Sequence, residues 1–296
     1  MSELEPPSPV GERSLPDHPL VAMLIAILLF AAATSLAIFV TSMLPPMRHG
    51  LGEAVKAAVT VAFGLTAYKV AIRHLGREPH DDLPERGAML KLALGVAAGG
   101  GLFSLIVGVA ALLGAYRISG CCDTTDLVSD LALSAVMPAF MEELLFRGIL
   151  FRWIEEFAGS WAALIVSSVL FGLAHSMNPG SSWLATGFIA LEAGVLLGGA
   201  YMLTRGLWMP MGLHGAWNFT QGFLFDVNVS GVEEHGLVTA KLSGPPLITG
   251  GEFGLEASIL ALLLATMAGI LLVVLAVRRG KFVSPSWSKP RTLSLE

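Results

Sequence analysis

The 296-residue chain is 54% hydrophobic and only 14% charged, whereas ordinary soluble domains are roughly 25% charged. Its net charge of −5 gives no indication of nucleic-acid binding, so we expect no nucleic-acid partner. The two cysteines, Cys121 and Cys122, are adjacent; this excludes a disulfide framework and a zinc knuckle, and we expect both to face solvent.

Uncharged stretches at 20–44, 92–116 and 257–277 exceed or reach the ~20 apolar residues that cross a bilayer. The first is too long for a signal-peptide core, so we expect it to be retained. The fold class predicted is all-α, a polytopic membrane helix bundle with about eight transmembrane helices. We expect these spans at 20–44, 53–72, 90–116, 128–151, 160–176, 183–204, 207–225 and 256–277.

The chain divides into one domain and two tails. Residues 1–19 are polar and Pro-rich and predict a disordered tail, 20–277 form the membrane-embedded domain, and 278–296 form a basic tail. Disorder is also expected over 281–296. The longest loop, 226–255, is rich in Gly, Pro and acidic residues and is expected outside the membrane.

Lysine and arginine are unevenly distributed between alternate loops. The C-terminal tail and the loop after the second span are rich in them, whereas Arg48, Arg117 and Lys241 are single basic residues in the loops of the other side. Cytoplasmic loops carry the excess of Lys and Arg. We therefore expect both termini in the cytoplasm, and the Ala- and Gly-rich composition favours the inner (cell) membrane of a bacterium.

The stretch "FMEELLFRGIL" (140–150) places charges inside a span, where each costs at least ~2.5 kcal/mol. On a helix, Glu143 and Arg147 are four residues apart and can neutralise each other as a structural ion pair. Glu142 points about 100° away and has no partner at helical spacing. An unpaired acid within a membrane is a functional candidate, and Pro138 can open the helix just before it.

Two further spans carry polar residues. His175 ends the fifth apolar segment, and His214 and Asn218 lie four residues apart in the seventh, on one helical face. A single buried histidine is more often a hydrogen-bonded structural residue than a catalyst. Two such segments together with Glu142 predict that Glu142, His175, His214 and Asn218 line one wet cavity.

These residue types suit hydrolysis of an amide. A glutamate and a histidine can take a proton from water, while a second histidine and an asparagine amide can donate hydrogen bonds to a developing oxyanion. No serine or cysteine lies in a nucleophile motif. Glu142, His175 and His214 are also acceptable zinc ligands, although H-E-x-x-H is absent and asparagine is a poor fourth ligand. The residues alone therefore leave two cofactor states open, none or zinc.

Three motifs make the chain resemble the CPBP family of intramembrane proteases, which includes type II CAAX prenyl endopeptidases and bacteriocin-processing or immunity proteins. The motifs are Glu-Glu-x-x-x-Arg at 142–147, Phe-x-x-x-His at 171–175 and His-x-x-x-Asn at 214–218, and the resemblance covers roughly 128–225. It implies an endopeptidase in which Glu142 and His175 activate water and His214 and Asn218 hold the oxyanion. Glu143 and Arg147 would support them. The family is traditionally named a metalloprotease, and a metal-free glutamate mechanism has also been argued for it.

The resemblance implies a membrane-associated protein or peptide as substrate, with or without a prenyl group, and the lipid bilayer as surroundings. Two other functions stay open: a non-proteolytic immunity or scaffold factor with the same fold, and a proton-coupled transporter. The complete polar set favours the protease, and the two halves show no inverted repeat of the kind that transporters have.

Other residues have ordinary structural interpretations. Glu192 in the sixth span is expected to be hydrogen-bonded or to reach the membrane surface, with lining of the cavity as the alternative. Gly194 and Gly198 indicate close helix packing. Trp217 and Phe171 either shape a substrate groove or pack in the core.

Overall fold

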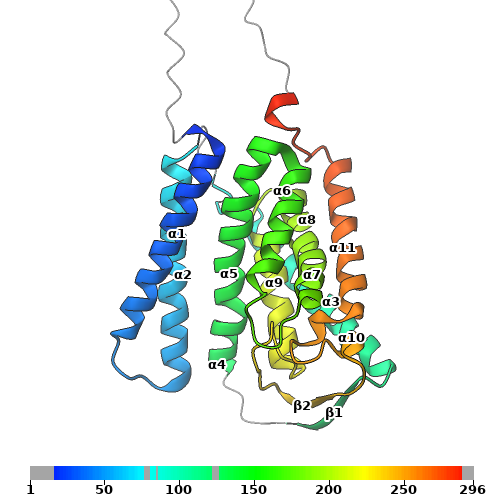
Figure 1. The fold of residues 1–296 in the computed structure, drawn as a ribbon. Helices are drawn as coiled ribbons and strands as arrows, with labels where there is room; N and C mark the ends of the chain where they lie inside the picture. Colours follow the sequence, from blue (N-terminus) through cyan, green and yellow to red (C-terminus); the bar gives the residue numbers. More distant parts are fainter. Residues whose placement is uncertain (1–16, 77–80, 85, 122–126, 289–296) are drawn as a thin grey trace, which may run out of the picture.

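The structure is a computed structural model that describes residues 17–76, 81–84, 86–121 and 127–288. It is a membrane helical bundle whose long helices run alternately up and down (Figure 1). We call the end that holds Pro19 and Arg278 the terminal face. The opposite end, which holds Ser42, Leu112 and a small two-stranded sheet, is the loop face.

The elements follow the expected spans closely. The helices are α1 Pro19–Ser42, α2 His49–His74, α3 Ala88–Leu112, α4 Leu127–Asp130, α5 Met137–Glu143, α6 Arg152–Ala174, α7 Trp183–Ile189, α8 Val195–Thr204, α9 Trp208–Phe219, α10 Pro246–Thr249 and α11 Ile259–Arg278. Short π-helical segments at Leu131–Val136, Leu144–Phe151, Ala190–Gly194 and Thr220–Leu224 continue several of them, and 3₁₀ turns form at Leu255–Ala257 and Ser286–Ser288.

The expected count of eight spans is not confirmed. Within the described residues, six helices are long and apolar enough to cross a membrane, and one of them, Leu127–Ala174, covers 48 residues. It includes two expected spans, because the chain bends at Gly159 (φ 81°), and within α6 this is the residue with a non-helical conformation. The expected span at 207–225 is divided between α9, of 12 residues, and a π-helical segment of 5.

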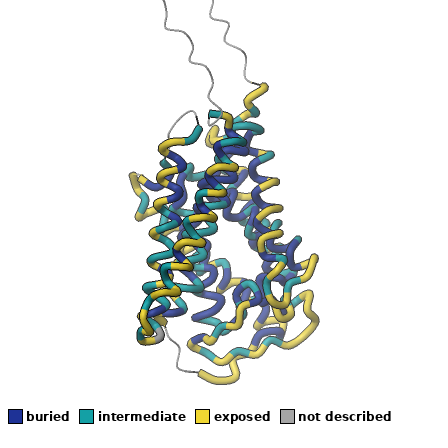
Figure 2. Tube along the Cα trace, turned by 60° about the vertical axis from the view of Figure 1, so that its left-hand side comes forward, coloured by how far each residue is buried: buried dark blue, intermediate teal, exposed yellow. Residues whose placement is uncertain are grey.

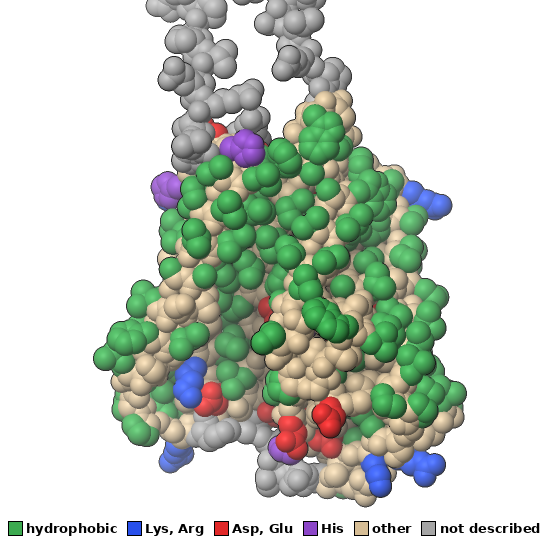
Figure 3. Space-filling model, viewed as in Figure 1, with side chains coloured by type: hydrophobic (Ala, Val, Ile, Leu, Met, Phe, Trp, Pro, Cys, Tyr) green, Lys and Arg blue, Asp and Glu red, His purple; other side chains and the backbone are tan. Residues whose placement is uncertain are grey.

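Large apolar side chains cover the outside of the bundle, as Figure 3 shows for one face. Leu28, Leu112 and Met267 are more than half exposed, and along α1, α2 and α11 exposed and buried positions alternate (Figure 2). A soluble protein rarely exposes contiguous apolar surface of this extent, whereas lipid-facing helices do.

Small residues bring the helices into backbone contact. A Cβ placed at Gly99 of α3 would lie 2.1 Å from the carbonyl oxygen of Leu213 in α9, and one at Gly212 would lie 2.4 Å from the carbonyl oxygen of Leu92. Gly194 and Gly198 pack in the same way on α6, which confirms the predicted close packing. Such contacts hold membrane helices together where burial from water contributes little, and here they fix the position of His214 next to Leu213.

The loop face departs from the all-α expectation. β1 (Tyr116–Cys121) pairs with β2 (Val238–Leu242) in an antiparallel two-stranded sheet. The carboxylate of Asp226 accepts hydrogen bonds from the backbone N–H groups of Gly236 and Ala240, so the loop at 226–255 is folded. Cys121 is an exposed free thiol, as expected, whereas Cys122 lies outside the described residues.

The C-terminal segment is partly ordered, which corrects the expectation of disorder from residue 281 onward. The backbone N–H of Val283 donates to Ser160 Oγ, and the N–H of Ser160 donates to the carbonyl of Val283. The first extended residues after α11 therefore fold back on the bend at Gly159. The predictions of disorder for 1–16 and 289–296 concern residues outside the described ones.

Candidate active site

Glu142 lies on a helix with widened turns. α5 carries Pro138 in its first turn and Glu142 in its last, and π-helical segments precede and follow it. The helix continues through Pro138 and is expanded on both sides of the motif. π-helical turns are frequent at functional sites, since they displace side chains from the regular 3.6-residue pattern.

Glu143 and Arg147 form the predicted ion pair, and both side chains are fully buried. Arg147 Nη1 donates to Glu143 Oε1 at 2.9 Å, and its guanidinium carbon lies 4.6 Å from the centre of the Phe171 ring. The same Glu143 oxygen lies 3.0 Å from His214 Nδ1. Glu143 therefore connects the structural ion pair to one of the predicted catalytic histidines, a link that the spacing of the motifs did not reveal.

His175 directly follows the last residue of α6, and its ring is oriented by its own motif. Its Nδ1 lies 2.8 Å from the carbonyl oxygen of Phe171. A carbonyl oxygen can only accept, so Nδ1 carries the hydrogen and Nε2 of the neutral ring is left as the basic nitrogen. The buried Phe171 ring is tilted by 37° relative to the imidazole, and the two ring centres lie 4.8 Å apart. Phe171 therefore packs against His175, and it also lines a small cavity beside the site.

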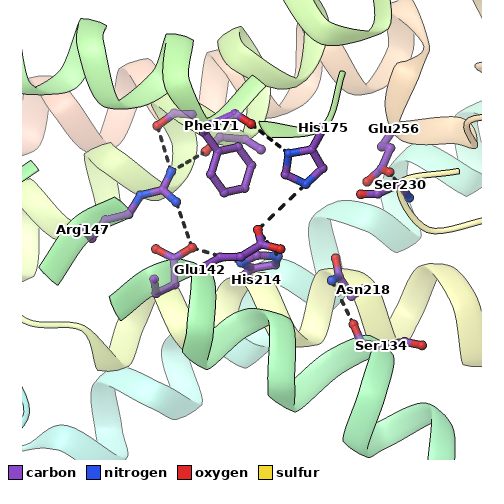
Figure 4. Close-up of polar contacts among 12 residues, drawn as sticks. Ser134, Glu142, Arg147, Phe171, His175, His214, Asn218, Ser230 and Glu256 are labelled. Atoms are coloured by element: carbon purple, nitrogen blue, oxygen red, sulfur yellow. Dashed lines mark hydrogen bonds and ion pairs between the residues drawn. The ribbon is translucent and has the colours of Figure 1, made fainter. Parts of the chain in front are cut away.

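Glu142 lies between the two histidines (Figure 4). Its Oε2 is 3.9 Å from His175 Nε2 and 3.9 Å from His214 Nε2, and this oxygen has no hydrogen-bond partner within the described part of the chain. Separations of this size between polar atoms are typical of groups bridged by water. The predicted convergence of Glu142, His175 and His214 is therefore present in the structure.

Asn218 lies one turn beyond His214 on α9, at the edge of the same space. Its Nδ2 donates to the carbonyl oxygen of Ser134 at 2.9 Å. An amide nitrogen has two N–H donors, so this bond fixes the side chain and leaves one donor for a ligand.

Two adjoining cavities meet at these residues. The larger, of about 390 Å³, reaches the loop face. A smaller one, of about 30 Å³, extends toward α8 and α11 and has room for about two water molecules. Both are lined by His175, His214 and Asn218, whereas Glu142 lines the larger and Trp217 the smaller. Trp217 therefore forms part of a cavity wall, one of the two interpretations open for it.

One buried acid of this site, Glu256, was not predicted from the sequence. Glu256, just before α11, is 4% exposed, lines the smaller cavity and accepts a hydrogen bond from the backbone N–H of Ser230. Burial raises the pKa of its carboxyl, while the nearby His175 and the Ser230 N–H oppose the rise. Glu256 directly precedes the uncharged stretch 257–277. Its functional importance could have been predicted from this position, because an acid at the edge of a membrane span needs a polar partner.

Glu192 differs from its expected role. It is 1% exposed, and neither of its carboxylate oxygens has a hydrogen-bond partner among the described residues. It belongs to the lining of neither cavity described above, although it lies within electrostatic reach of Glu256. The expectation that it is hydrogen-bonded or reaches the membrane surface is therefore wrong.

Glu142, His175 and His214 are the residues that could bind a metal ion. The other ring nitrogen of each histidine is hydrogen-bonded, as is usual for metal ligands. However, no three His, Cys, Asp or Glu side chains among the described residues are grouped so that they could hold a metal ion. As they are arranged in the described structure, Glu142, His175 and His214 therefore do not form a metal site, and the choice between no cofactor and zinc stays a prediction.

One comparison with known proteins gave a match. Residues 124–220 match the family model described as type II CAAX prenyl endopeptidase Rce1-like. This segment contains all three motifs and the residues that converge on Glu142. No curated protein matched the chain, and no solved structure matched it.

Proposed function

Because the chain belongs to the CPBP family of membrane peptidases, we propose that it is an intramembrane endopeptidase. Its substrate is a peptide bond in a membrane-associated protein or peptide. The observation that carries the proposal is the approach of Glu142 to both histidines within one cavity. A scaffold or immunity factor of the same fold would not need this arrangement.

In the proposed reaction, a water molecule lies between Glu142 Oε2 and His175 Nε2. Glu142 takes its proton as the water attacks the carbonyl carbon of the scissile bond, and His175, whose Nε2 is the basic nitrogen, orients the water. The proton is then delivered to the leaving amine, which completes hydrolysis without an acyl-enzyme. The Glu142 side chain is partly exposed, whereas the oxygen that takes the proton, Oε2, is itself buried and has no hydrogen-bond partner among the described residues.

His214 and Asn218 are proposed to stabilise the tetrahedral oxyanion. Donors that face the developing charge lower the barrier most when they are fixed in advance. Glu143 fixes His214 through Nδ1, and Ser134 fixes Asn218. The Glu143 carboxylate also stabilises a doubly protonated His214 ring, whose Nε2–H then faces the cavity as a donor.

The proposal is tested by comparing the membrane proteome of the host with the gene intact and deleted. A longer precursor of at least one membrane-associated protein should accumulate on deletion and be processed again when the gene is restored. If the two proteomes contain the same protein termini, the chain acts without proteolysis.

Metal dependence gives a separate prediction. If water is activated by Glu142 and His175 directly, excess chelator should leave cleavage by the purified protein unchanged, and elemental analysis should find well under one zinc per chain. A metal site would instead lose metal and activity together, since its ligands must hold the ion to function. One zinc per active chain, lost with activity in Glu142→Ala, would refute the metal-free route.

Asn218→Ala should slow turnover by about 10²–10³-fold, the cost of removing one oxyanion donor, with little change in KM. Asn178→Ala is the matched control, since Asn178 also lines the larger cavity and donates to a backbone carbonyl, that of Ser230. Turnover should be measured on the precursor identified above. Equal losses in both variants would indicate a general structural effect and remove Asn218 from the oxyanion site.

A further inference from the structure

We infer that this active site opens to the non-cytoplasmic face of the membrane and takes its substrate from that side. The inference rests on the proposed function, because it concerns the side from which the substrate of that site arrives. It combines two independent observations: where the larger cavity opens and which face of the bundle carries the basic residues.

The larger cavity opens at the loop face. Its outer wall is formed by Asp130 at the start of the Leu127–Ala174 helix and by Val232 and Glu233 of the folded loop, both exposed. Val229 and Val232 of this loop form a two-residue bridge beside the opening. In Figure 3, acidic side chains gather at this lower end around a hollow, on the side of the molecule away from the termini.

The basic residues gather at the other end. Near the terminal face lie Lys69, Arg73, Arg86, Lys91, Arg152, Arg205, Arg278, Arg279 and Lys281. Near the loop face the described basic residues are fewer: Arg48, Lys56, Arg117 and Lys241.

Contacts between elements confirm that the first set shares one face. Arg152 pairs with Asp82 at 3.0 Å, and Lys91 donates to the carbonyl oxygen of Thr204 at the end of α8. These partner acids do not alter the expected orientation, because orientation in the membrane follows Lys and Arg and not net charge. The terminal face is therefore assigned to the cytoplasm, and the cavity, which opens at the opposite end, faces outward.

This orientation defines the class of substrate. A cytoplasmic C-terminal peptide would meet the terminal face, where neither of the two cavities opens among the described residues and the buried network of Asp82, Tyr68 and Tyr201 packs between helices. The substrate is instead a segment on the outer side of the membrane, as in an exported peptide or the outer flank of a membrane anchor. Asp130 and Glu233 at the opening disfavour a free terminal carboxylate there, so cleavage is expected at an internal bond.

Cysteine labelling tests the orientation directly. Cys121 and Cys122 are replaced by serine, and a single cysteine is then introduced by Val232→Cys at the cavity opening or by Ser288→Cys on the terminal face. Both positions are exposed. Intact cells and inside-out vesicles of a bacterial host are treated with a membrane-impermeant maleimide, and labelling is read as a gel shift. The wild-type chain, with exposed Cys121 on the loop face, is treated in parallel as a second reporter.

We expect Val232→Cys and wild-type Cys121 to be labelled in intact cells, and Ser288→Cys only in inside-out vesicles. The opposite pattern, or labelling of Ser288→Cys in intact cells, overturns the inference. Labelling needs no activity, so it is separable from the proposed function. If Val232→Cys is labelled in intact cells but no precursor accumulates on deletion, the proposed protease activity is refuted and the orientation is supported. If a precursor accumulates but Val232→Cys is labelled only in inside-out vesicles, the orientation alone is refuted.

Discussion

Glu142→Gln is expected to abolish cleavage while leaving the protein folded and inserted in the membrane. Glutamine keeps the size of the side chain and can still hydrogen-bond, but it cannot take a proton from water. Loss of a general base costs typically 10²–10⁴-fold. The larger effect is expected here, because the carboxylate lies 3.9 Å from both histidines and no second acid of the larger cavity is paired with them in the described structure. Turnover of the identified precursor by purified protein is the measurement.

Glu233→Gln is the matched control for that substitution. Glu233 lines the same cavity but is exposed at its opening, so its variant should retain nearly full turnover. Elution as a single detergent-solubilised species would show that Glu142→Gln is folded. If Glu142→Gln retained activity within about threefold of wild type, well below the contribution of a general base, Glu142 would have no role in the chemistry.

Arg147→Met is expected to destabilise the protein strongly. The substitution leaves the Glu143 carboxylate in the core without its cation, and breaking a buried ion pair in this way costs about 3–5 kcal/mol. Arg147 Nη2 also lies 3.4 Å from the carbonyl oxygens of Ala193 and Gly194, and it therefore bridges two membrane-spanning helices. The expected result is a low yield and a clearly lower melting temperature in detergent.

Lys56→Met provides the comparison. Lys56 also pairs with a glutamate, Glu53, at 2.9 Å, but its side chain is 48% exposed, and surface pairs contribute about 0–1 kcal/mol. Its melting temperature should stay near that of the wild type. An Arg147→Met protein as stable as the wild type yet inactive would instead assign Arg147 to the reaction.

The sequence predicted the residues of the site better than the shape of the helices around it. Helical spacing was sufficient to pair Glu143 with Arg147 and to place His214 and Asn218 on one face, since both depend on neighbours four residues apart. Spacing could not predict the π-helical turns beside Glu142, because they arise from packing against other helices. The hydrogen bond that Asn218 Nδ2 donates to the carbonyl oxygen of Ser134 involves such a turn, because Ser134 lies in the π-helical segment Leu131–Val136.

Long-range contacts explain the other differences. Glu256 reaches the site only because the loop before α11 folds back, and its partner is the backbone of Ser230 in another part of that loop. The joining of two expected spans depends on Gly159, whose φ of 81° keeps the bend compact; a Cβ there would lie 2.9 Å from the carbonyl oxygen of Val283. No periodicity in the sequence encodes either contact.

The shared oxygen of Glu143 has a consequence for evolution. Arg147 and His214 both bind Oε1 of this carboxylate, so the buried triple of Glu143, Arg147 and His214 must be retained for folding whether or not the protein cleaves anything. Glu142 meets the triple only across the 3.9 Å gap to His214 Nε2, and His175 meets Glu142 across an equal gap, so either can change without unpairing a buried charge of the triple. A relative that loses proteolytic activity but keeps this fold is therefore expected to lose Glu142 or His175 first. A relative that retains only Glu143, Arg147 and His214 is expected to be folded but without proteolytic activity.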